Sequence, residues 1–61
     1  MEDIRELSII ELNDFEKYIL ESNLDDLFEG RPIIYVYEDT TFEMRLKVEM
    51  HHIKVQMEVI R

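Results

Sequence analysis

Residues 42–50 read FEMRLKVEM, a stretch in which apolar and charged side chains alternate at every position. Side chains along a β-strand point to opposite faces in turn, so this stretch predicts a strand with one buried and one exposed face. Residues 53–59 (IKVQMEV) alternate in the same way and predict a second strand over about 53–60. This period of two decides the fold class of the C-terminal half.

The two strands align if His51 and His52 form a two-residue loop. Val48 then lies opposite Val55, so that apolar side chains meet on one face. The same alignment pairs opposite charges on the other face: Glu49 with Lys54 and Arg45 with Glu58. A His-His pair is unusual in a tight hairpin, where Asn-Gly is preferred. The alternative is one long, bulged strand from 42 to 60.

A third strand precedes these two. Residues 38–41 (EDTT) predict a loop, and residues 32–38 predict a strand in which Tyr35 lies opposite Met44 and Tyr37 opposite Phe42. The aromatic side chains then share the apolar face, which indicates that they belong to the core. The result is a three-stranded antiparallel meander over about 32–38, 41–50 and 53–60.

The N-terminal half has helical patterning. Ser8-Ile9-Ile10-Glu11 is a capping box, and Leu7 and Leu12 have the spacing of a hydrophobic staple. We therefore expect a helix over about 9–22, which presents Leu12, Phe15 and Ile19 to the core. Residues 3–7 fit either a short strand or an early helical turn.

A second, shorter helical turn is expected over residues 24–29, with Leu27 and Phe28 pointing inward. Gly30 suits the position just past a helix, and Pro32 prevents the helix from continuing. The sequence thus predicts an α+β fold in which a helix packs on the three-stranded meander.

The length of 61 residues predicts one domain, 1–61. So short a chain buries only about 60% of its unfolded surface, and it has no cysteine for disulfides or thiolate metal sites. A dense core or association with a second copy must therefore stabilise it. No apolar run approaches the ~18 residues of a membrane span. Because the acidic start also lacks the basic region of a signal peptide, we expect a cytoplasmic protein.

The net charge of −8 is concentrated in one half of the chain. Residues 1–29 hold ten carboxylates and two cations, whereas residues 31–61 hold five of each. An anionic surface repels nucleic acid phosphates and anionic membranes, and it attracts basic partners. We therefore expect a protein partner with a basic surface, and no direct contact with nucleic acid or membrane.

Motifs for catalysis or cofactors are lacking in this sequence. A single glycine excludes a glycine-rich phosphate loop, and Ser8 is explained as a helix cap. Adjacent strand residues point to opposite faces, so His51 and His52 cannot share a metal unless they lie in a turn. The carboxylates at 25–29 fit a solvated helix end. We expect no catalytic residue, no cofactor and no metal.

Two groups of residues are candidates for partner binding. The first is acidic and helical: Glu11, Asp14, Glu21, Asp25, Asp26 and Glu29. The second is Ile34 and Val36, which point away from the helix-covered face and form an exposed apolar pair. The segment around Ile4, a second copy of the chain or a target protein could cover this pair.

These features favour a small acidic protein-interaction module that binds and inhibits or sequesters a basic nucleic-acid-handling protein. Phage-encoded inhibitors, anti-CRISPR-like proteins and DNA mimics are of this type. The alternative is an antitoxin or a homodimeric accessory subunit, in which the charge serves mainly for solubility. An enzyme is disfavoured, because so short a chain has little room for a pocket around a buried carboxyl.

Overall fold

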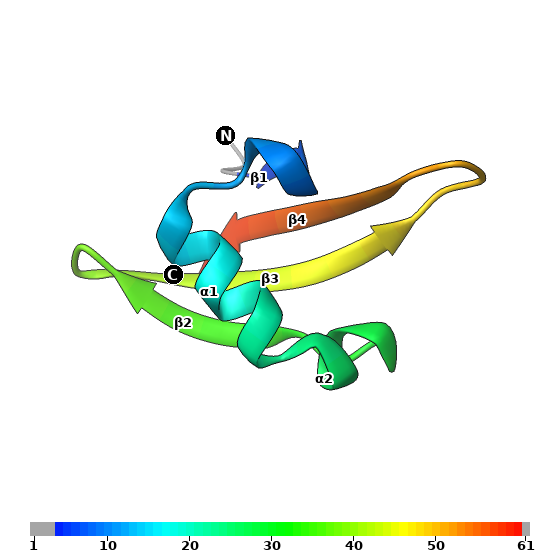
Figure 1. Cartoon of the computed structure of the whole chain (residues 1–61). Coiled ribbons are helices and arrows are strands. Elements are labelled where there is room, and N and C mark those ends of the chain that lie inside the picture. Colours follow the sequence, from blue (N-terminus) through cyan, green and yellow to red (C-terminus); the bar gives the residue numbers. More distant parts are fainter. Residues whose placement is uncertain (1–3, 61) are drawn as a thin grey trace.

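The computed structural model describes residues 4–60 and has an α+β fold (Figure 1). The elements, in chain order, are β1 (Ile4–Ser8), a 3-10 helix (Ile9–Glu11), α1 (Asp14–Ser22), α2 (Leu24–Phe28), β2 (Ile33–Tyr37), β3 (Thr40–Val48) and β4 (Ile53–Val59). The strands form one antiparallel sheet in the order β1-β4-β3-β2. The α+β class is confirmed, but the sheet has four strands where three were predicted.

The additional strand is β1, which pairs with β4 and forms one edge of the sheet. Its Leu7 lies opposite Val55 and packs against the core, whereas Ile4 and Glu6 point to the other face. Five residues are too few to separate a period of two from a helical turn. The pairing with β4 therefore decides between the two states that the sequence left open.

The helices cover one face of the sheet, as Figure 1 shows. Seven buried apolar residues form the core between the two layers: Leu12, Leu20, Leu27, Tyr35, Met44, Val55 and Met57. The open face of the sheet carries Ile34 and Val36 of β2, together with the charged residues of β3 and β4. Phe28, predicted to point inward, is exposed instead.

The helix predicted over 9–22 is interrupted. The capping box at Ser8 is present, but it begins only the 3-10 turn Ile9–Glu11. Leu12 and Asn13 then adopt extended conformations, with ψ of 146° and 174°. A second capping box begins α1, because the Asn13 Oδ1 accepts from the backbone N–H of Glu16 at 2.8 Å. Leu12 reaches the core from this extended link.

The alignment of β3 with β4 differs from the predicted one by two residues. Val48 lies opposite Ile53, and Met44 lies opposite Met57, so Glu49 and His52 close the hairpin with mutual backbone hydrogen bonds of 2.8 and 3.3 Å. The turn therefore consists of Met50 and His51. His51 and His52 do not form the turn together, and the chain from 42 to 60 is not one bulged strand.

Of the two charge pairs predicted between these strands, Glu49–Lys54 still forms, whereas Arg45–Glu58 is wrong, because Arg45 pairs with Glu43. Lys47 lies opposite Lys54, and Glu43 lies opposite Glu58. The ion pairs formed run along a strand, diagonally, or across to β1: Arg45–Glu43 at 2.6 Å, Lys54–Glu49 at 3.8 Å and Lys47–Glu6 at 2.9 Å. A shift of two keeps every side chain on its face, and exposed ion pairs contribute too little to choose between the two alignments.

The β2–β3 alignment is also two residues from the predicted one. Tyr35 lies opposite Phe42, and Tyr37 lies opposite Thr40, so the turn consists of Glu38 and Asp39. Both residues have positive φ, 50° and 63°. A two-residue type I′ turn requires this conformation, which Asn and Gly adopt most readily. The Glu-Asp pair gave no sequence cue for so tight a turn.

We expect the double substitution Glu38→Asn and Asp39→Gly to raise the free energy of unfolding by about 1–2 kcal/mol, because it removes the strain of two left-handed residues. Thermal and urea denaturation at high ionic strength would measure the gain without the effect of two lost carboxylates. The matched control is Met50→Asn with His51→Gly, since that turn has negative φ angles. An equal gain in the control would contradict this explanation.

Candidate protein-interaction surfaces

Three of the predicted acidic side chains gather where α1 meets α2. A single residue, Asn23, separates the helices and ends α1, because its side-chain amide donates to the Ile19 carbonyl at 2.8 Å. The resulting bend sets Glu21 of α1 beside Asp25 and Asp26 of α2. All three carboxylates line one shallow depression of about 460 Å³.

A cation from the next segment neutralises part of this surface. Gly30, with φ of +89°, turns the chain back at the end of α2, and the Arg31 backbone N–H donates to the Asp26 carbonyl at 2.9 Å. The Arg31 guanidinium then pairs with Asp26 at 2.8 Å and with Glu29 at 3.0 Å. Four predicted carboxylates form no ion pair with any residue of the described range 4–60: Glu11, Asp14, Glu21 and Asp25.

Glu11 lies apart from this depression and has a local role. Its Oε1 accepts from the Ser8 backbone N–H at 2.9 Å and from the Ser8 hydroxyl at 2.8 Å. The backbone hydrogen bond, followed by the hydroxyl, holds the pKa of Glu11 below its ordinary value. Glu2 and Asp3, part of the acidic N-terminal half, lie outside the described residues.

Ile34 and Val36 lie together on the open face of β2, as predicted. They are 55% and 62% exposed, respectively. Ile4 does not cover them, because β1 lies at the opposite edge of the sheet from β2. Within the described residues, this apolar pair therefore has no cover.

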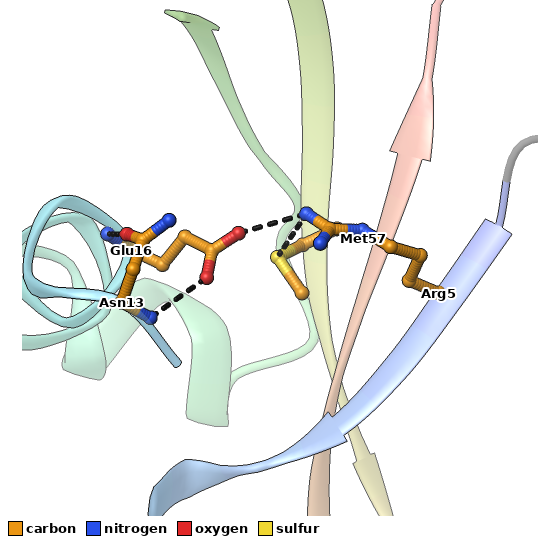
Figure 2. A network of polar contacts seen from close by, with 4 residues as sticks. All are labelled: Arg5, Asn13, Glu16 and Met57. Carbon is orange, nitrogen blue, oxygen red and sulfur yellow. Dashed lines mark hydrogen bonds and ion pairs between the residues drawn. The ribbon is translucent and has the colours of Figure 1, made fainter. Parts of the chain in front are cut away.

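A third site was not predicted: an ion pair between the exposed Arg5 and the buried Glu16 at the rim of an aromatic pocket (Figure 2). The Arg5 guanidinium of β1 donates to Glu16 Oε2 of α1 at 2.8 Å, and the Asn13 backbone N–H donates to Oε1 at 2.9 Å. The Arg5 guanidinium also donates to the Met57 sulfur at 4.0 Å, the contact marked by a dashed line in Figure 2. The pocket, of about 260 Å³, is lined in part by four aromatic residues: Phe15, Tyr35, Tyr37 and Phe42.

The arrangement ties elements together and offers no reactive group. Both oxygens of Glu16 accept hydrogen bonds, and the Arg5 charge compensates the carboxylate, which is only 7% exposed. The pocket rings also contact one another, with Phe15 and Tyr37 centroids 5.0 Å apart. We therefore assign the pair to holding β1 and α1 together.

The sequence contains a pattern that could have indicated the burial of Glu16. Leu12, Glu16 and Leu20 are spaced four residues apart, which sets Glu16 on the same stripe as two core leucines. Asn13 and Glu16 also have the spacing of a capping box. A carboxylate on a buried stripe needs a cation, and the arginine nearest in the sequence is Arg5.

Burial raises the pKa of Tyr35 to about 12, with a smaller contribution from the Glu16 carboxylate. Since the unfolded phenol ionises near 10, the folded state holds this proton more tightly. The stabilisation is complete below pH ~10 and is lost as the pH rises towards 12. We expect a loss of at most about 3 kcal/mol across this range in alkaline denaturation. Tyr35→Phe should remove this part of the pH dependence, and an unchanged profile would contradict the assignment.

His51 and His52 are exposed at the end of the β3–β4 hairpin. Among residues 4–60, no cluster of three or more His, Cys, Asp or Glu side chains is arranged to hold a metal ion. In the same part of the chain, no helix is long and apolar enough to span a membrane. Comparisons with protein-family models, curated proteins and solved structures find no match to this chain.

Proposed function

We propose that the chain is a small acidic protein-interaction module that binds a basic nucleic-acid-handling protein and inhibits or sequesters it. The observation that supports this proposal is the acidic depression at the α1–α2 junction, formed by Glu21, Asp25 and Asp26. Two of these carboxylates, Glu21 and Asp25, have no cation partner within residues 4–60. They are therefore available to a lysine or arginine of another protein.

The proposed mechanism is steric and electrostatic. The carboxylates of the helical layer occupy positions in a Lys/Arg-lined groove where nucleic acid phosphates otherwise bind. Attraction between opposite charges speeds the encounter and is screened by salt. This mode of inhibition belongs to the broad class of phage-type and anti-CRISPR-like inhibitors and DNA mimics.

The test begins with capture of the partner from cells that carry the gene, followed by purification of the captured protein. We expect the association rate constant to fall at least about tenfold between 0.05 and 0.5 M salt. The chain should also displace a labelled duplex or RNA from the purified partner. A partner that retains its nucleic acid when saturated with the chain would contradict the proposal.

A matched pair of variants locates the contact. Glu21→Gln with Asp25→Asn removes two charges from the depression, and we expect association to slow by about threefold to tenfold. Glu49→Gln with Glu58→Gln removes one charge from the β3–β4 hairpin and one from β4, and it should slow association less. Equal losses in both variants would mean that net charge, and not the depression, drives binding.

A further inference from the structure

β2 is an edge strand without the usual protection. Its five residues, IIYVY, contain no charge and no proline, and nothing lies beyond it in the described sheet (Figure 1). Exposed edges normally carry charges, prolines or bulges that prevent pairing with another strand. The other edge, β1, follows this rule, because it contains Arg5 and Glu6.

The backbone hydrogen bonds show which groups of β2 point outward. The Ile60 N–H donates to the Thr41 carbonyl at 2.9 Å, so the polar groups of Thr41 face β4 and not β2. Val36 lies opposite Thr41 and therefore belongs to a non-hydrogen-bonded pair of the β2–β3 ladder. Since such pairs alternate, the N–H and C=O groups of both Ile34 and Val36 point away from the sheet.

We propose that a second copy of this chain pairs its β2 with the β2 of the first, antiparallel, in the register that sets Ile34 opposite Val36 of the second copy. Each of these two symmetric pairs exchanges two backbone hydrogen bonds. The two sheets then join into one continuous sheet across a two-fold axis at Tyr35. This inference is independent of the proposed function.

The ends of β2 select this register. A shift in one direction sets Val36 opposite Pro32 of the second copy, which has no N–H to donate. A shift in the other direction sets Ile34 opposite Glu38, which lies in the turn with φ of 50°. Only the register centred on Tyr35 uses every outward group of Ile34 and Val36.

Side chains and charges favour the same arrangement. Ile34 and Val36 of both copies meet on the open face and form an apolar cluster, which accounts for their exposure in the single chain. Antiparallel pairing also sets Arg31, at the start of one strand, near Glu38 and Asp39 at the end of the other. The Arg31 side chain pairs with Asp26 and Glu29 of its own chain, but it is 63% exposed and so remains open to this attraction. Parallel pairing would instead place like charges together.

Sedimentation and hydrogen exchange test this dimer on the full chain. We expect a concentration-dependent dimer that strengthens with added salt, because salt screens the repulsion between two copies of net charge −8. Binding to a basic partner should weaken with salt, so the two proposals can fail separately. In the dimer, the amide protons of Ile34 and Val36 should become protected as concentration rises, whereas that of Tyr35 should not change. A strict monomer at millimolar concentration would overturn the inference.

Two variants of β2 test the dimer, and the second of them, Ile34→Pro, separates edge pairing from contact between open faces. Val36→Lys adds the charge that protects natural edges and should weaken the dimer by at least about tenfold. Val48→Lys changes a valine that is also mostly exposed but lies away from this edge, and it should leave the dimer unchanged. Ile34→Pro removes an outward N–H while keeping an apolar side chain, and it should also give monomers. Circular dichroism confirms folding of each variant, and a dimer that survives both β2 changes overturns the inference.

Discussion

Met44→Ala is expected to lower the free energy of unfolding by about 2–5 kcal/mol. Met44 is fully buried at the centre of the sheet, between Ile33 of β2 and Met57 of β4. A domain of this size has a total stability of only about 3–9 kcal/mol. The substitution therefore removes a large share of the total stability, which urea denaturation followed by circular dichroism would measure.

Met50→Ala is the matched control, because Met50 is 90% exposed in the β3–β4 turn and the same atoms are removed. We expect it to change stability by less than about 0.5 kcal/mol. If Met44→Ala fails to fold, Met44→Leu keeps the volume and should cost less than about 1.5 kcal/mol. A loss in the Met50 variant equal to that at Met44 would contradict the assignment of the core.

The alternation in residues 42–50 predicted the strands and their buried faces, because the period of two depends only on local geometry. It could not predict register. A shift of two residues leaves Met44 and Leu46 on the same face, and only turn geometry distinguishes the alternatives. The turn at Glu38-Asp39 consists of two residues with positive φ, and neither is the Gly or Asn that would indicate such a turn in the sequence.

The sequence predicted that the N-terminal half is acidic, but it predicted less well which carboxylates lie together. The grouping of Glu21 with Asp25 and Asp26 follows from the helix break at Asn23, which lies between the two predicted helical segments 9–22 and 24–29. The neutralisation of Asp26 by Arg31 did not follow, since it depends on how Gly30 turns the chain back. Long side chains find partners through tertiary geometry, which a one-dimensional pattern does not contain.

The Arg5–Glu16 pair joins β1 to the helical layer, and we expect substitutions of its two residues to lower stability by very different amounts. Arg5→Met should lower the free energy of unfolding by about 2–3 kcal/mol, because it leaves the buried Glu16 carboxylate without a cation. Glu16→Gln should cost only about 1 kcal/mol. Glutamine can still accept from the Asn13 N–H, and the 55% exposed Arg5 side chain can turn to water.

The double variant Arg5→Met with Glu16→Gln completes the thermodynamic cycle. Once the carboxylate is gone, losing Arg5 no longer leaves a buried charge, so the double variant should be about 1–2 kcal/mol more stable than the sum of the single losses predicts. Arg45→Met is the control for deleting a surface arginine, since its partner Glu43 lies along the same strand. Strict additivity of the Arg5 and Glu16 losses, or an equal loss in the Arg45 variant, would show that the pair does not hold β1 to α1.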